Sequence, residues 1–111
     1  MASVIGPTTI VNQAALAANY TSPSIDVVRH EGWSIGFTSD GDLLGTIKLQ
    51  GANVDTAMNY ADIKNASSTM GAATTPVMFV ANLARYKFVR AVFTYTSGTG
   101  NLIGTFIAKG V

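Results

Sequence analysis

The segment from Tyr86 to Lys109, YKFVRAVFTYTSGTGNLIGTFIAK, contains two runs rich in apolar residues with a short polar stretch between them. Successive side chains of a β-strand point to opposite faces, so the alternation in each run indicates a strand. The polar stretch supplies two glycines, Gly98 and Gly100, which can take the positive φ of a tight turn. We therefore predict that two strands, 87–95 and 102–108, pair as an antiparallel hairpin.

The two faces of the first strand differ in kind. One face suits a hydrophobic core, because it carries Val89, Ala91, Phe93 and Tyr95. The other face is aromatic and apolar but interrupted by an arginine, which is typical of a central strand or of a strand that meets a partner chain. We predict that this second face forms a protein–protein interface through Tyr86, Phe88, Arg90 and Val92.

Arg90 is the charged residue on this predicted interface. A buried guanidinium without a partner is too costly to persist, so we expect it to meet a carboxylate or backbone carbonyls. The candidate carboxylates are Asp26, Glu31 and Asp62. The alternative is an exposed arginine whose stem covers apolar surface.

Short strands recur along the rest of the chain. Residues 33–37 and 46–50 alternate at period two, and the turn Ser39–Asp42 between them contains an Asp-Gly pair typical of hairpins. The polar run 64–75 is expected to be a long connection. About eight strands spaced roughly 8–12 residues apart predict an all-β fold, an antiparallel β-sandwich of jelly-roll type. The expected core is Trp33, Ile35, Phe37, Ile47, Leu49, Val89 and Phe93.

The chain has 111 residues, the length of one domain. Its first 24 residues carry no charge, and the strand pattern begins at Ile25. We predict an N-terminal arm or edge segment over 1–24, making edge or intermolecular contacts, and a sandwich domain over 25–111.

Charge is sparse, at 12% of residues against about 25% in a typical soluble domain. A low charged fraction favours a protein that is packed against neighbours in an assembly. The net charge of +1 gives no electrostatic reason to expect nucleic acid as a partner.

The absence of cysteine excludes disulfides and thiolate metal sites. No membrane span and no signal peptide is evident, so we expect synthesis in a host cytoplasm.

Enzymatic motifs are weak. His30 and Glu31 are adjacent and therefore point to opposite faces of a strand, which makes them a poor acid–base pair. The glycine-containing turn 97–100 joins two strands, so it lacks the helix that a phosphate loop needs. We expect no enzyme activity, no catalytic residue and no cofactor.

Four oxygen-bearing residues lie near strand ends: Asp40, Asp42, Asn53 and Asp55. They suit turn hydrogen bonds, with a Ca²⁺ site as the less favoured alternative.

The tyrosines leave a second function open. Exposed aromatic rings on a β-sandwich can stack on sugars, and Tyr20, Tyr60 and Tyr86 are the candidates for such contacts. The alternative function is therefore a carbohydrate-binding module that binds glycan through loop tyrosines.

Four motifs follow one another along the chain: WSIGF (33–37), GTIKLQGAN (45–53), YADI (60–63) and YKFVRAVFTYTSGTGNL (86–102). Their order resembles that in a family of small β-sandwich proteins from the structural modules of bacteriophage genomes. The resemblance implies a non-enzymatic structural component of a virion, with capsid decoration or minor capsid protein favoured over a spike or tail protein. It implies partners among other virion proteins and further copies of the chain, as a homo-oligomer.

Overall fold

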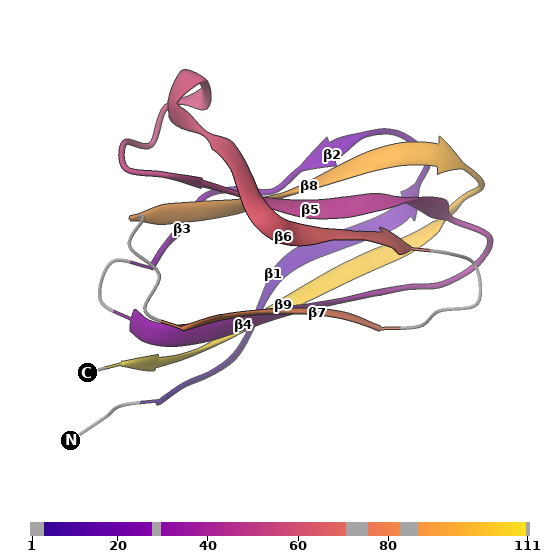
Figure 1. Ribbon diagram of the computed structural model, residues 1–111. Coiled ribbons are helices and arrows are strands. Elements are labelled where there is room, and N and C mark those ends of the chain that lie inside the picture. The colour runs from indigo at the N-terminus through magenta and orange to yellow at the C-terminus, as the bar shows by residue number, and fades with distance from the viewer. Residues whose placement is uncertain (1–3, 28–29, 71–75, 83–86, 111) are drawn as a thin grey trace.

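The computed structural model describes residues 4–27, 30–70, 76–82 and 87–110. Over these residues the chain folds almost entirely into β-strands, with one short 3-10 helix. The predicted all-β antiparallel sandwich is confirmed, because the strands form two antiparallel sheets packed face to face (Figure 1). The elements are β1 (Val4–Leu16), β2 (Tyr20–Thr21), β3 (Ile25–Asp26), β4 (His30–Ser39), β5 (Leu44–Ala52), η1 (Ala57–Asn59), β6 (Ala61–Met70), β7 (Val77–Asn82), β8 (Phe88–Ser97) and β9 (Gly100–Gly110).

The four-stranded sheet has the order β1-β9-β4-β7, and the five-stranded sheet has the order β2-β8-β5-β6. In the second sheet β3 also pairs with β8, beyond β2 along the same edge. Figure 1 shows the two layers, with the N- and C-terminal ends of the chain close together at one end of the sandwich. The termini meet because β1 and β9 are paired antiparallel from Val4↔Lys109 to Leu16↔Gly100.

The predicted hairpin of the segment 86–109 is wrong in its pairing. β8 belongs to the five-stranded sheet, where it pairs with β5, whereas β9 belongs to the four-stranded sheet, where it pairs with β1 and β4. The turn between them crosses from one sheet to the other. The predicted hairpin with its turn at Ser39–Asp42 is another such crossing, because β4 and β5 also lie in different sheets. We call these two crossings the β4–β5 arch and the β8–β9 arch.

The two arches pack against each other. Thr99 N donates to Asp42 Oδ1 at 2.8 Å, and Asn101 N donates to Asp40 Oδ1 at 2.7 Å. The glycines of the β8–β9 arch are required by this contact, because a Cβ at Gly98 or Gly100 would overlap the carbonyl of an aspartate in the β4–β5 arch. Gly98 also has φ +81°, which side chains other than glycine rarely adopt.

Stacked arches explain how the sheets are joined. Because β4 pairs with β9 and β5 pairs with β8, each strand of one arch lies beside a strand of the other arch in its own sheet. The same alternation that suggested a hairpin therefore places one face of each strand in the space between the sheets.

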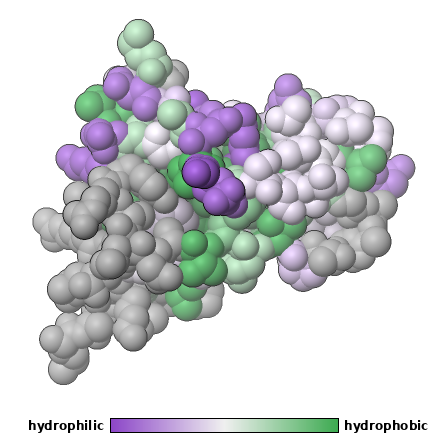
Figure 2. Space-filling view, viewed as in Figure 1, coloured by the Kyte–Doolittle hydropathy of each residue, from purple (hydrophilic) through white to green (hydrophobic). Residues whose placement is uncertain are grey.

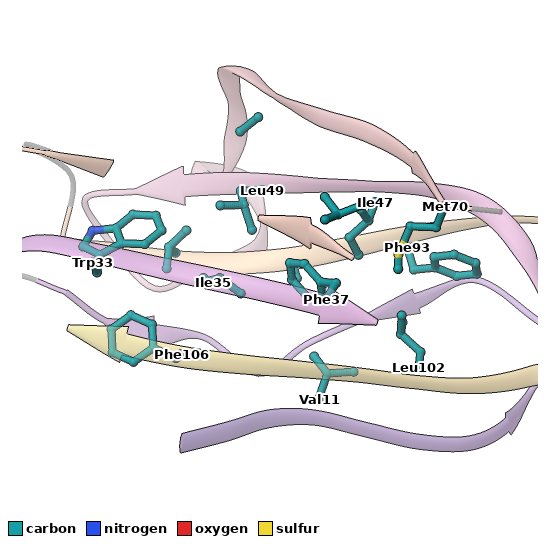
Figure 3. Close-up of a cluster of buried hydrophobic side chains, with 14 of the residues drawn as sticks. Val11, Trp33, Ile35, Phe37, Ile47, Leu49, Met70, Phe93, Leu102 and Phe106 are labelled. Atoms are coloured by element: carbon teal, nitrogen blue, oxygen red, sulfur yellow. The ribbon is translucent and has the colours of Figure 1, made fainter. Parts of the chain in front are cut away.

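The predicted core is confirmed: all seven expected residues are at most 4% exposed. Figure 3 shows Trp33, Ile35 and Phe37 of β4 in the interior with side chains of the opposite sheet. The core also contains residues that the sequence analysis did not name, among them Leu43, Met70, Leu102 and Phe106.

One further segment differs from its predicted role. The run 64–70, expected to be part of a connection, continues β6 and buries Ala66 and Met70. The N-terminal segment supplies β1, an edge strand, and Val11 of this strand is 1% exposed in the core. The division of the chain at residue 24 stays a prediction.

Candidate functional site on the outer face of the five-stranded sheet

The register of the five-stranded sheet gathers polar and apolar side chains on its outer face. Arg90 of β8 lies opposite Gln50 of β5, which in turn lies opposite Asp62 of β6. Neighbouring positions on the same face hold the Val92–Lys48 pair and the Asp26–Phe88 pair. We call this surface the β8 face and define it by Asp26, Lys48, Gln50, Asp62, Phe88, Arg90 and Val92.

Arg90 is held by two neighbours. Its Nε donates to Gln50 Oε1 at 2.9 Å, and its Cζ lies 4.0 Å from the centroid of the Tyr60 ring. A planar guanidinium can stack on an aromatic face while it donates in its own plane, which lysine cannot do. The direct acceptor is therefore a side-chain amide, not one of the carboxylates or backbone carbonyls that the sequence analysis expected.

Asp62, one of the expected partners, is joined to Arg90 through Gln50. Gln50 Nε2 donates to Asp62 Oδ1 at 2.9 Å, and Lys48 Nζ lies 3.1 Å from the same carboxylate oxygen. The hydrogen bonds from Gln50 and then Lys48 lower the pKa of Asp62 below its ordinary value. The row Lys48–Asp62–Gln50–Arg90 is thus a connected chain of charged and amide groups.

Tyr60 links the β8 face to the loop before β6. Its hydroxyl donates to Asp55 Oδ1 at 2.9 Å, and Ser24 Oγ donates to Asp55 Oδ2 at 2.8 Å. Partial burial and then the hydrogen bond to Asp55 raise the pKa of Tyr60 above 10.0, although Arg90 acts in the opposite direction. Asp55 therefore fixes the ring that stacks on Arg90.

Three of the four predicted interface residues, Phe88, Arg90 and Val92, occupy consecutive outward positions of β8, and each is partly exposed. Tyr86 lies outside the described residues. Asp26 is on the same face, opposite Phe88, while the side chain of Glu31 lies outside the described ones. Gln50 was not predicted as part of this surface, although it lies two residues after Lys48 and so shares the outer face of β5.

Two of the tyrosines proposed for sugar stacking, Tyr20 and Tyr60, lie in the described residues, and both already contact other side chains. Tyr20 is half-buried and packs against the core, and one side of the Tyr60 ring is covered by Arg90. Beside Asp62 an open depression of about 410 Å³ lies between the end of β5 and the start of β6. It is lined by Gly51, Ala52, Asn53, Asn59, Ala61, Asp62, Ile63 and Lys64.

Two of the remaining polar candidates serve the turns. Asp40 and Asp42 bind the β8–β9 arch, which confirms their predicted role in turns. Asn53 and Asp55 follow the other end of β5, so these four residues do not gather at one place. Within the described ranges, no group of three or more His, Cys, Asp or Glu could hold a metal ion. In the same ranges, no helix has the length and apolar character needed to cross a membrane.

No protein-family model and no curated protein matches the chain. Solved structures do match it. The prophage-derived protein YomS of SPBc2 has a TM-score of 0.63 at 13% identity, with 99% of this chain and 96% of that chain covered. The PBSX exported protein XepA also has a TM-score of 0.63, at 12% identity, with 95% of this chain and 37% of that chain covered.

A carbohydrate-binding module has a similar fold as well. The C-terminal CBM6 of the laminarinase LamC from Zobellia galactanivorans has a TM-score of 0.54 at 10% identity, with 93% of this chain and 99% of that chain covered. At identities this low, these likenesses show the β-sandwich fold alone.

Proposed function

We propose that the chain is a non-enzymatic structural component of a bacteriophage virion. The observation that carries the proposal is the composition of the β8 face, where the partly exposed Phe88 and Val92 lie among charged groups that are already tied to one another. Phe88 and Val92 lie on either side of Arg90, and protein–protein contacts combine such apolar side chains with paired polar groups.

Two other observations support the virion assignment. The fold likeness to prophage-derived YomS spans nearly the whole of both chains. The charged fraction of 12% suits a subunit whose surface is largely covered in an assembly. The proposed partners are other virion proteins, the proposed location is the particle, and a decoration or minor capsid role is favoured over a tail role.

In this role the protein acts by mass action. Each copy adds one contact of modest size, and a contact of about 1,200–2,000 Å² is enough for specific association. Repetition of the contact over a particle multiplies its effect, because subunits already held in the lattice bind at high effective concentration.

The test is incorporation into particles. Val92→Lys replaces an apolar side chain of the β8 face with a charge beside Lys48, and we expect at least about a tenfold loss of protein in purified particles. Ala17→Lys changes an exposed residue between β1 and β2 in the same way and serves as the matched control. Equal incorporation of the two folded variants would contradict the use of the β8 face.

A second candidate function is a carbohydrate-binding module, which the fold of the LamC module and the open depression beside Asp62 favour. Its weakness is that Tyr60 offers a sugar only the side of the ring away from Arg90. Binding of the purified wild-type protein to an oligosaccharide array, lost in Asp62→Ala and retained in Ala17→Lys, would establish this function. No binding at millimolar oligosaccharide would reject it.

A further inference from the structure

The outer face of the four-stranded sheet exposes four large apolar side chains. Met78 and Val80 of β7 are 61% and 67% exposed, and Ile103 and Ile107 of β9 are 40% and 39% exposed. The register places Val80 and Ile107 on either side of Ser34, and Met78 beside Gly36. We call this surface the β4 face, consisting of Ser34, Gly36, Met78, Val80, Ile103 and Ile107.

Among the side chains that the structure describes, charge is segregated away from the β4 face. The charged side chains that the structure describes belong to β3, β5, β6 and β8 or to the loops beside these strands, Asp40 and Asp42 of the β4–β5 arch included. The other described outward positions of the sheet that contains the β4 face are uncharged, for example Thr9, Asn12 and Thr105. Figure 2 shows hydrophobic atoms over the position of β7, at the near edge of this sheet.

We infer that the β4 face is the surface through which two copies of the chain associate, about a two-fold axis. A surface without charge requires a partner surface without charge, because unpaired charges lose their hydration on contact. The β4 face itself meets this requirement, and a two-fold axis brings the same patch of two subunits together.

The shape of the face also suits a second sheet. Ser34 and Gly36 are small and lie along β4, between the larger side chains of β7 and β9. Facing sheets pack about 10 Å apart when side chains of each interdigitate with those of the other. The end of the Met78 side chain lies over Gly36, so the low position on β4 is Ser34. Val80 and Ile107 of one copy can therefore lie over Ser34 of the other.

The available area matches a weak dimer. Four strands about 4.8 Å apart and about ten residues long span roughly 600 Å² per copy. A standard interface takes about 800 Å² from each partner, so the whole outer face of this sheet, β1 included, approaches this value. We expect a dissociation constant of about 10–100 µM, in the range of small interfaces. This inference does not rest on the virion assignment, because a dimer in solution would leave the β8 face of each copy free.

The experiment is sedimentation equilibrium of the purified chain over a concentration series to about 1 mM. The wild type should dimerise, and the double variant Val80→Lys, Ile107→Lys should raise the dissociation constant at least about 100-fold by placing charges at the centre of the contact. Thr94→Lys, Ser67→Lys, at exposed positions of β8 and β6, is the matched control and should dimerise as the wild type does. A wild type that stays monomeric at 1 mM, or a double variant that dimerises normally, would overturn the inference.

A cross-linking readout keeps the test independent of folding defects. The chain has no cysteine, so Ser34→Cys places a single thiol at the centre of the β4 face. A bis-maleimide with a spacer of about 10 Å should link two copies of Ser34→Cys, because facing sheets lie about that far apart. Thr94→Cys should give at most a tenth of that yield. Equal yields from the two variants would place the contact elsewhere.

Discussion

At the scale of single residues, Arg90 shows what a sequence can and cannot specify. Its outward direction follows from alternation with the buried Val89 and Ala91. Its partner does not follow, because the pairing of Gln50 with Arg90 depends on the register of two strands 40 positions apart in the chain. Asp62, one of the three expected carboxylates, lies on the next strand, β6, and is joined to Arg90 through the amide of Gln50.

The coupling between Arg90 and Gln50 can be measured with a double-mutant cycle. Arg90→Met keeps most of the stem, and we expect it to lower the free energy of unfolding by about 1–2 kcal/mol through the lost hydrogen bond and ring stacking. Gln50→Leu in the same cycle should give a coupling of about 0.5–1.5 kcal/mol by urea unfolding. A coupling below about 0.3 kcal/mol would mean that the observed contact adds nothing to stability.

Tyr60 gives a prediction of pH dependence. Burial and the Asp55 hydrogen bond raise the pKa of this phenol in the folded state above 10.0, so the neutral form is stabilised by folding. That stabilisation is complete below the unfolded pKa of about 10 and is lost as the pH rises through the folded pKa. Absorbance at 295 nm, as the difference between wild type and Tyr60→Phe, should show ionisation above pH 10.0.

Replacement of Asp55 tests whether this carboxylate is a cause of the raised pKa of Tyr60. Asp55→Asn removes the carboxylate charge beside the hydroxyl, so ionisation of Tyr60 should move to lower pH. A Tyr60 phenol that ionises at or below its ordinary pKa in the folded wild type would contradict the geometry of this contact.

At the scale of elements, the two turns were predictable but the strands they join were assigned to the wrong partners. Asp-Gly and Gly-rich turns occur both in hairpins and in arches, since each needs positive φ in a short connection. Only the pairing of β4 with β9 and of β5 with β8 distinguishes the two cases, and that pairing is a property of the whole sandwich. In β6, Ala66 and Met70 are too widely spaced among polar residues to indicate a strand.

The β8–β9 arch gives a prediction about Gly98. Gly98→Ala forces a side chain into the left-handed region and against the carbonyl of Asp42, so we expect a loss of at least about 2 kcal/mol in unfolding free energy. Ser97→Ala, an exposed neighbour, should change stability by less than about 0.5 kcal/mol. Urea midpoints for the two variants that differ by less than the error would show that the arches do not pack as described.

At the scale of the whole molecule, the sandwich and its core were predictable. Period-two alternation is visible in each short segment, and it determines which side chains of a strand enter the core. The separation of charge between the two outer faces was not predictable, because it depends on which strands share a sheet. Over the described side chains the molecule has two different surfaces: the β8 face, where bonded charged groups alternate with apolar residues, and the β4 face, whose six residues are uncharged.

The proposal that this chain is a structural protein of a virion is tested most directly by its copy number in purified particles. Particles released by cells that carry the coding sequence would be banded by density and digested, and peptides of this chain would be quantified against those of the major head protein. The account predicts several copies per particle or more, at a constant ratio across the density band. Absence of the chain from the band, while it is abundant in the lysate, would contradict the account.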